Sequence, residues 1–274
     1  MPRVTVIMAT WNWSTVLPYS IGSVLGQTMT DFELLVVGDG CTDDSEAVVR
    51  AVDDPRVRWI NLPQNTGHQS GPNNEGLRQA RGEFIAYLGH DDLWLPHHLE
   101  VLCAALDRGA DLAHTLIAFV PPPGSGRTLT VGRREWKPPS SVMHRRSATE
   151  TAGGWRDYRG MMDTPEGELW ARIEAAGFRV EFVPRLTVIK FPALWRKNVY
   201  RQRPCEEQKA WLARIRAEPD LELVELAKIA SGIQPRFSDR LLRLLRSPSE
   251  WPSVLWRRPG ARIRAWQRYK GVRH

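Results

Sequence analysis

Two hydrophobic patterns alternate along the first half of the chain. Short runs rich in β-branched and apolar residues predict strands at residues 4–8, 32–37, 57–61 and 84–88. Between and after them, apolar positions spaced three or four residues apart predict helices at residues 20–25, 45–52, 71–80 and 99–106. Strands that alternate with helices predict an α/β fold with a mainly parallel sheet, flanked by helices and built with right-handed crossovers.

The pattern becomes irregular after residue 106 and resumes later in the chain. Loops rich in proline, glycine and serine are expected at residues 121–126 and 138–141. A helix over 168–176, stopped by Gly177, and a strand over 180–183 follow. Beyond residues 191–192 the composition shifts to Arg, Trp and Leu, and helices are expected at 206–218, 221–230 and 239–246. We therefore predict a main domain over residues 1–192 and a basic helical extension over residues 193–274.

Composition is that of an ordinary globular protein. The chain has 274 residues, of which 42% are hydrophobic and 25% charged. Its apolar N-terminal stretch lacks the pattern of a cleaved leader, and no apolar run reaches the roughly 20 residues of a membrane-spanning helix. The three cysteines are far apart and show no zinc-ligand spacing, which favours reduced thiols and a cytoplasmic setting.

Charge is unevenly distributed along the chain. The formal net charge is +7, and Arg and Lys concentrate in the last eighty or so residues. A basic protein can attract phosphates, but no helix-turn-helix or RNA-binding motif is present, so we expect no nucleic-acid partner. Residues 236–246 and 251–266 combine Arg with Leu and Trp. Such a tail can lie peripherally in a membrane interface or pack on the main domain with its Arg side chains in water, and both interpretations stay open.

Candidate binding residues follow each predicted strand of the first half. They are Ala9 and Trp11 after the first, Asp39 after the second, Asn65 after the third, and Asp91 and Asp92 after the fourth. Ligands of α/β folds bind at the carboxyl ends of the strands. There an aromatic can stack on a base, a carboxylate can accept a base N–H, and two adjacent carboxylates can hold a divalent metal against phosphates. The alternative for the acidic pair is a helix N-cap ahead of residues 95–96.

Several stretches occur in the order typical of one enzyme family. They are VTVIMATWN, SVLGQTMTDFELLVVGDGCTDDS, NTG, RGEFIAYLGHDDLW, SVMHRRS, GGW and PEGELWARIEAAGFRVEFVP, covering about residues 3 to 190. Over this span the chain resembles the family 2 glycosyltransferases, bacterial nucleotide-sugar enzymes with the Rossmann-like GT-A fold. The resemblance implies an inverting glycosyltransferase that takes a sugar from a nucleotide-diphosphate donor.

The resemblance also implies roles for the residues after the strands. Asp39 would bind the base with Trp11 against it, and Ala9, Asn65 and Asp91 would complete the nucleotide pocket. Asp91 and Asp92 would stand for the Asp-x-Asp motif, with Asp92 as the ligand of Mn²⁺ or Mg²⁺. Gly38 and Pro72 depart from the family pattern, which usually has Asp and Arg at these positions. UDP is the favoured donor nucleotide, with dTDP and GDP as alternatives.

The catalytic base implied by the resemblance is Glu166. The family places an acidic residue six positions before the Arg of a Leu-Trp-x-Arg helix, and six positions before Arg172 is Glu166. The alternative is a carboxylate that simply favours the start of a helix. We also expect His144 and Trp170 as candidate substrate contacts, although a lone His is more often structural.

The predicted function is metal-assisted sugar transfer to an acceptor hydroxyl. The acceptor stays open between a glycan, a lipid-linked molecule and a small molecule. A nucleotidyltransferase is disfavoured because no glycine-rich phosphate loop follows the first strand. The remaining alternative is a non-catalytic protein that binds nucleotide sugars or associates with membrane. We expect a cytoplasmic location, with the tail as the part that could reach the inner face of the membrane.

Overall fold

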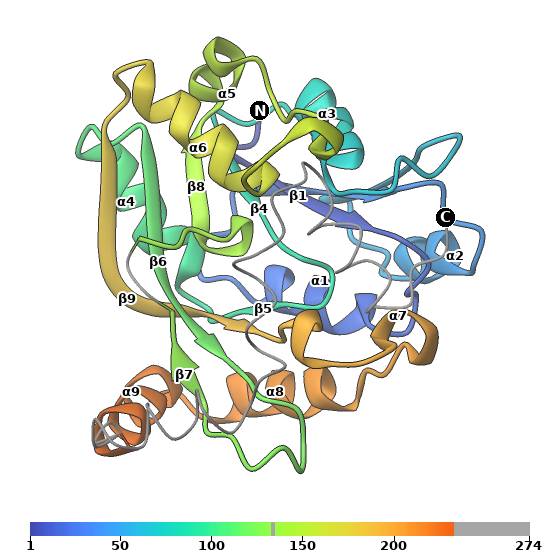
Figure 1. Cartoon of the computed structure of the whole chain (residues 1–274), viewed down its shortest axis with the longest axis vertical. Helices are drawn as coiled ribbons and strands as arrows, with labels where there is room; N and C mark the ends of the chain where they lie inside the picture. The colour runs from blue at the N-terminus through green and yellow to red at the C-terminus, as the bar shows by residue number, and fades with distance from the viewer. Residues whose placement is uncertain (133–134, 233–274) are drawn as a thin grey trace.

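A mixed sheet runs through the protein and carries helices on both faces (Figure 1). The computed structural model describes residues 1–132 and 135–232. Within this part the strands follow the order β3-β2-β1-β4-β8-β6-β9-β5, with β7 paired to β6. The strands are β1 (Val4–Thr10), β2 (Phe32–Gly38), β3 (Val57–Asn61), β4 (Phe84–Tyr87), β5 (Leu93–Trp94), β6 (Leu112–Phe119), β7 (Thr130–Val131), β8 (Val142–Arg145) and β9 (Val180–Lys190).

Helices join and cover these strands. The α-helices are α1 (Leu17–Leu25), α2 (Ser45–Arg50), α3 (Ser70–Gln79), α4 (His98–Asp107), α5 (Arg146–Ala152), α6 (Pro165–Ala175), α7 (Val199–Gln202), α8 (Glu206–Ala217) and α9 (Leu221–Gly232). Short 3₁₀ helices are η1 (Pro139–Ser141), η2 (Tyr158–Gly160) and η3 (Ala193–Trp195). The predicted α/β fold is confirmed. The strands β6 and β8, which the sequence analysis did not predict, lie near the middle of the sheet.

The first four strands form a parallel block. β1 pairs in parallel with β2 on one side and with β4 on the other, and β3 extends the block beyond β2. Alternate side chains of β1 point to opposite faces, so that Val6 packs in the cluster under α1 and α4 while Ile7 packs in the cluster under α3 and α6. Because both faces are covered, β1, β2 and β4 are buried almost throughout, whereas the edge strand β3 is half-buried.

The second half of the sheet changes direction twice. β8 runs antiparallel to both β4 and β6, and β9 runs parallel to β6. Two reversals restore the original direction, so β6 and β9 point the same way as β1 to β4. The carboxyl ends of all six strands therefore lie at one edge of the sheet. β9 reaches that edge at its last residue, Lys190.

The described part of the predicted extension packs on the main domain. Leu212 and Ile215 of α8 and Leu221 of α9 share a hydrophobic cluster with Leu186 and Ile189 of β9. The helices expected at 206–218 and 221–230 are present as α8 and α9. The basic segments at 236–246 and 251–266 lie outside the described residues.

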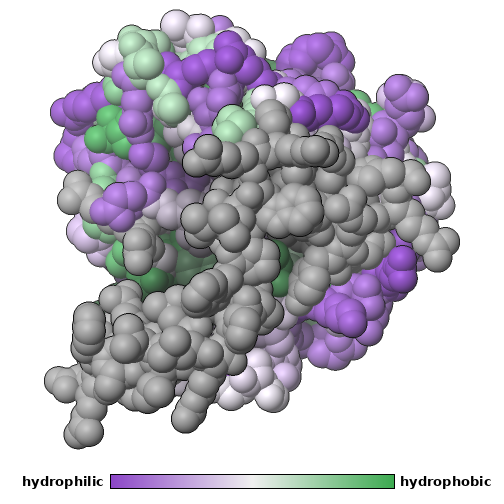
Figure 2. Space-filling model, in the orientation of Figure 1, coloured by the Kyte–Doolittle hydropathy of each residue, from purple (hydrophilic) through white to green (hydrophobic). Residues whose placement is uncertain are grey.

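The surface gives no sign of a membrane span in the part of the chain that is described. No helix there is long and apolar enough to cross a membrane. In the view of Figure 2 the described surface is mostly hydrophilic, with smaller hydrophobic areas among the polar ones. The predicted peripheral contact depends on residues outside this region and stays a prediction.

Glu33 of β2 connects three segments at the amino-terminal edge of the sheet. Its side chain is 2% exposed; Oε1 accepts hydrogen bonds from Thr5 Oγ1 and from the Arg81 backbone N–H, both at 2.8 Å. Oε2 accepts from the Arg81 guanidinium at 2.6 Å. Burial raises the pKa of Glu33, but the hydrogen bonds from Arg81 and Thr5 lower it by more, and the pKa ends below the ordinary 4.5.

We predict that Glu33→Ala lowers the free energy of unfolding at pH 7 by about 3 kcal/mol, because it leaves buried donors unpaired. A carboxyl with a depressed native pKa stabilises the fold above its unfolded pKa and loses this effect as pH falls through the native pKa. The loss in free energy of unfolding caused by Glu33→Ala should therefore become smaller below pH 4.5. Urea unfolding followed by circular dichroism at pH 7 and at acid pH measures both effects. Glu46→Ala, which breaks an exposed pair with Arg50, is the control and should change little. A deficit that does not depend on pH would contradict this account.

Candidate functional site

The loops after β1 and β2 are fastened to each other at the carboxyl edge. Asn12 has a left-handed backbone conformation, with φ of 46°. Its side-chain oxygen accepts hydrogen bonds from the backbone N–H of Thr42 at 2.7 Å and of Asp43 at 3.2 Å. The Asp39 N–H donates to the Thr10 carbonyl at 2.8 Å. These bonds fix the segment that carries Trp11 beside the segment that carries Asp39.

Asp39 is buried directly after β2, and the loop after β3 folds over it. It is 4% exposed, and its Oδ1 accepts hydrogen bonds from the Thr66 N–H at 2.9 Å and the Thr66 hydroxyl at 2.7 Å. Asn65 donates to the Asp39 carbonyl at 3.1 Å. Burial raises the pKa of Asp39, although the hydrogen bonds from Thr66 and Gly67 oppose it. Asp39 and Asn65 therefore lie together, as expected, while their role toward a base stays a prediction.

Gly40 allows this close approach. Its φ of +65° lies in the left-handed region that favours glycine. A Cβ at this position would lie 2.4 Å from the Asn65 backbone nitrogen, so any other residue would force the backbone to move. The two loops can thus meet only around a glycine.

Trp11 and Ala9 lie at the same edge. The Trp11 ring is half-buried, with its centroid 6.2 Å from that of Tyr200 in α7. The Tyr200 ring also packs edge-on against Trp13 at 5.3 Å and His90 at 5.9 Å. The Ala9 carbonyl lies 3.2 Å from His90 Nδ1. Tyr200 of the extension therefore forms one wall beside Trp11, together with Trp13 and His90 of the main domain.

The acidic pair after β4 divides into a buried and a half-buried carboxylate. Asp92 is 0% exposed. Its Oδ2 accepts hydrogen bonds from the Ser140 hydroxyl and from Lys190 Nζ, both at 2.6 Å, and its Oδ1 accepts from the Phe191 N–H at 3.3 Å. Asp91 is half-buried, and its backbone carbonyl accepts from Gln208 of α8 at 3.1 Å.

The helix-cap alternative for this pair does not hold. The next helix, α4, begins at His98, its N-cap residue is His97, and no side chain caps it. The pair instead lies in a loop whose contacts reach η1, β9 and α8.

A divalent metal was predicted at Asp92, and the hydrogen bonds of the Asp92 carboxylate can be compared with the ligands that such a metal prefers. Mg²⁺ and Mn²⁺ prefer free carboxylate oxygens together with substrate phosphates and water. Both Asp92 oxygens already accept protein hydrogen bonds, and the Lys190 ammonium balances the charge. Among the described residues no group of three or more His, Cys, Asp or Glu side chains could hold a metal ion. The Asp92 contacts thus do not fit direct ligation, and a metal requirement stays a prediction.

Glu166 lies in the first turn of α6 and faces the same loops. Thr164 caps this helix by accepting the Gly167 N–H at 3.2 Å, and Pro165 follows it. Glu166 is half-buried, and its Oε2 accepts a hydrogen bond from Gln69 at 3.4 Å. Burial raises the pKa of Glu166, while its own backbone N–H, the Lys190 ammonium and the Thr164 hydroxyl oppose the rise.

These contacts bring the predicted acidic residues together. Gln69, which contacts Glu166, lies three residues after Thr66, which holds Asp39. Lys190 bonds Asp92 and is close enough to affect the titration of Glu166. Burial lowers the pKa of Lys190, but the Asp92, Asp91 and Glu166 carboxylates raise it by more. Asp39, the acidic pair and Glu166 thus lie around one edge of the sheet.

His144 and Trp170 are not at this site, which corrects the expectation that they contact substrate. His144 is 0% exposed, its Nδ1 lies 2.8 Å from the Arg145 carbonyl and its Nε2 lies 3.1 Å from the Tyr87 hydroxyl. Burial lowers its pKa to about 4. Trp170 is 2% exposed and donates to the Lys137 carbonyl at 2.8 Å. Both side chains belong to the core between the sheet and α6, where no substrate reaches.

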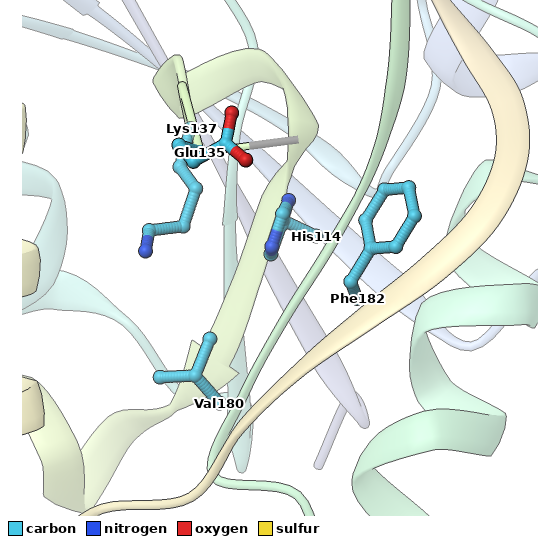
Figure 3. A pocket seen from close by; sticks show the side chains of 5 residues that line it. All are labelled: His114, Glu135, Lys137, Val180 and Phe182. Atoms are coloured by element: carbon cyan, nitrogen blue, oxygen red, sulfur yellow. The ribbon is translucent and has the colours of Figure 1, made fainter. Parts of the chain in front are cut away.

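A pocket at the other edge of the sheet is separate from these residues. It is lined by His114, Glu135, Lys137, Val180 and Phe182 (Figure 3). His114 lies near the start of β6, and Val180 and Phe182 begin β9. Asp92 and Lys190 belong to the opposite, carboxyl edge, so none of the predicted site residues lines this pocket.

The sequence analysis missed several residues of the site. They are Gln69, Ser140, Lys190, Tyr200 and Gln208. Lys190 had a recognisable signal, since it is a charged residue inside the apolar run Val188 to Phe191. A charge placed in such a run needs a partner. The others carry no local signal, because only the tertiary fold brings them to the edge.

Open α/β sheets bind their ligands in the crevice outside the carboxyl ends of the strands, which is where these acidic loops lie. The family model described as "Glycosyl transferase family 2" matches residues 5–170. The chain belongs to glycosyltransferase family 2.

Curated relatives agree with this assignment. The chain is 37% identical over 114 residues to the GalNAc(5)-diNAcBac-PP-undecaprenol beta-1,3-glucosyltransferase of Campylobacter jejuni, covering 40% of this chain and 36% of that protein. It is 29% identical over 203 residues to the putative glycosyltransferase EpsE of Bacillus subtilis, covering 65% of this chain and 69% of that one. The chain matches about a third of the length of the first relatives found.

Solved structures show the same GT-A fold. TarS of S. aureus in complex with UDP-GlcNAc matches 99% of this chain and 84% of its own, with a TM-score of 0.59 and 19% identity. The predicted GT-A fold class is therefore confirmed.

We predict that Asn12→Ala destabilises the fold by about 1–2 kcal/mol, because it removes two hydrogen bonds to backbone N–H groups and strains a left-handed residue. Asn12→Gly loses the same bonds without the strain and should cost less. Urea unfolding of both variants measures the difference. Equal stability of the two variants would show that backbone strain plays no part.

Proposed function

We propose that this protein transfers a sugar from a nucleotide-diphosphate donor to an acceptor hydroxyl with inversion, and that Glu166 is the general base. The observation that carries the proposal is the convergence of Asp39, the acidic pair and Glu166 at one edge of the sheet. Membership in glycosyltransferase family 2 supports the reaction class. Asp39 and Trp11 would bind the base of the donor nucleotide, with Ala9, Asn65 and Asp91 around the rest of it.

The reaction needs one displacement. The acceptor oxygen forms a bond to the anomeric carbon, the bond from that carbon to the diphosphate oxygen breaks, and its electron pair leaves with the nucleoside diphosphate. The acceptor proton passes to the Glu166 carboxylate. A carboxylate whose pKa is raised by burial holds that proton more readily than one in water.

The proposed acceptor site is a pocket formed by residues that precede and follow Glu166 in the sequence. It is lined by Arg156, Asp157, Gly160, Met161, Met162, Asp163 and Glu168, and Glu166 itself is not among the lining residues. Its exposed Met162 and its charged groups would suit a partly apolar, hydroxyl-bearing acceptor. A lipid-linked glycan is the favoured acceptor, because the C. jejuni relative is named for an undecaprenol-linked one.

UDP is the favoured donor nucleotide. The TarS complex with UDP-GlcNAc supports it, while the Pyrobaculum calidifontis mannosyltransferase with GDP-Man and Mn²⁺ keeps GDP as the alternative. A non-catalytic protein that binds nucleotide sugars is the second candidate function. The half-buried Glu166 with a raised pKa favours the enzyme, since a simple binding site does not need such a group.

We predict that Glu166→Gln leaves the affinity for UDP unchanged and lowers turnover by roughly 10²–10⁴-fold, because it removes only the base. Release of UDP from UDP-sugars and isothermal titration calorimetry measure the two quantities. Glu174→Gln, on the same helix but paired with Lys137 beyond the acceptor pocket, is the matched control and should keep most activity. Turnover of Glu166→Gln close to that of the unsubstituted protein would exclude the proposed role.

We predict that the pH dependence of activity, together with the melting temperature, distinguishes a catalytic base at Glu166 from a carboxylate that only favours the start of the helix. A base must be deprotonated, so activity rises with pH through its pKa, and the acid limb of kcat/KM should lie above the ordinary 4.5. A raised native pKa also means that the charged form destabilises the fold at neutral pH. Glu166→Gln should therefore keep or raise the melting temperature at pH 7. A lower melting temperature would favour the helix-start role.

We predict that Asp39→Asn weakens UDP binding at least tenfold, because one acceptor oxygen toward the base becomes an N–H₂ donor. The amide oxygen can still accept from Thr66, so the fold should survive. Thermal-shift measurements against UDP, GDP and dTDP, each with Mn²⁺ and with EDTA, report affinity and nucleotide preference. Asp44→Asn, whose side chain makes no capping bond, is the control. Unchanged UDP affinity would remove Asp39 from the site.

A further inference from the structure

We propose that Lys190 is the resident cation of the acidic pair, and that its ammonium takes the place at Asp92 that a divalent metal would occupy. Resting on the proposed function, the inference adds that this ammonium supplies positive charge to the donor diphosphate. UDP should then bind, and react, without a divalent metal.

The contacts of Asp92 carry the first step. Lys190 Nζ and the Ser140 hydroxyl both lie 2.6 Å from Asp92 Oδ2, and the Phe191 N–H reaches Oδ1 at 3.3 Å. A Mg²⁺ ion bound to these oxygens would lie about 2.0–2.1 Å away, in the space that the ammonium and the hydroxyl hold. An ion pair whose carboxylate is fully buried is costly to break, because removing the ammonium leaves the buried carboxylate unpaired. Asp92 therefore keeps Lys190 rather than exchanging it for a metal.

The fold places this ammonium firmly. Lys190 is the last residue of β9, and its carbonyl accepts the Val120 N–H at 2.9 Å at the end of the pairing with β6. The side chain extends from a strand that is paired on both sides, with β6 and β5, rather than from a loop, which limits its freedom. About a fifth of it remains exposed, at 21%. The ammonium is thus fixed on one side by Asp92 and still open to the site on the other.

The surrounding charges carry the second step. Lys190 Nζ lies 2.6 Å from Asp92 Oδ2, and Asp91 precedes Asp92 in the same loop, so one ammonium lies beside two adjacent carboxylates. Such a site repels a diphosphate unless a cation faces it. A cation within electrostatic reach of Glu166 lies beside the carbon where the base and the leaving group act. There its charge can stabilise the departing diphosphate.

The unsubstituted protein provides the first test. UDP affinity is measured by calorimetry in EDTA and in Mn²⁺, and UDP release from UDP-sugars is measured in the same two buffers. We expect both quantities to agree between the buffers within about threefold. UDP binding that requires Mn²⁺ would overturn this inference and leave the proposed function standing. Absence of UDP binding in both buffers would overturn the proposed function and the inference with it.

Two variants provide the second test. Lys190→Gln should weaken UDP binding in EDTA by roughly 10- to 100-fold, the effect of losing a hydrogen bond to a charged group. Added Mn²⁺ should restore part of this affinity, because the Asp92 carboxylate is then free. Lys137→Gln is the matched control: Lys137 Nζ lies 2.6 Å from Glu174 with 18% of its side chain exposed, beside the separate pocket of Figure 3.

Comparing Lys190→Gln with Lys137→Gln in EDTA and in Mn²⁺ also distinguishes an electrostatic role of Lys190 from a purely structural one. A structural role predicts that Lys190→Gln lowers the melting temperature but keeps its UDP affinity in EDTA, and that Mn²⁺ changes nothing. That result, or an affinity loss no larger than that of Lys137→Gln, would overturn the inference. Should Lys190→Gln fail to fold, the comparison of EDTA and Mn²⁺ on the unsubstituted protein still decides.

Discussion

Strand direction is the constraint on which the site depends. Six strands end at one edge of the sheet because two antiparallel pairings, around β8, restore the direction of the first four in β6 and β9. Residues far apart in the sequence, such as Asp39 and Lys190, are thereby brought to the same edge. A sheet of another topology built from the same strands would bury the same apolar surface but would separate these side chains. Packing alone thus does not explain the site.

Three carboxylates at this edge have three environments, and each suits a different task. Asp39 is held by Thr66 and stays oriented. Asp92 is buried against Lys190 and cannot turn toward a substrate without breaking that pair. Glu166 accepts a long hydrogen bond from Gln69 at 3.4 Å, and burial raises its pKa against the opposing effects of its own backbone N–H and the Thr164 hydroxyl. A half-buried carboxylate with a raised pKa is suited to exchange a proton.

Periodicity was sufficient to predict the parallel half of the sheet. The strand expected at 57–61 is present as β3, because a short apolar run between turn residues has few alternatives. β6 was missed although Leu112 to Phe119 is almost wholly buried, since His114 and Thr115 interrupt its apolar run. Buried polar residues of this kind are satisfied by distant partners; Thr115 bonds Thr187 of β9 at 2.7 Å. Sequence spacing cannot reveal such a partner, and the same limit hid Ser140 from the site prediction.

The boundary predicted at residue 192 does not coincide with an edge of the site. Gln208 is 3% exposed and donates to the carbonyl of Asp91, and Tyr200 packs beside Trp11 and His90. Leu212 and Ile215 bury their side chains with β9 residues of the main sheet. The described part of the extension therefore completes the wall of the site and restrains the loop of the acidic pair. Within this described part, apolar and amide side chains among the Arg residues make these contacts with the main domain.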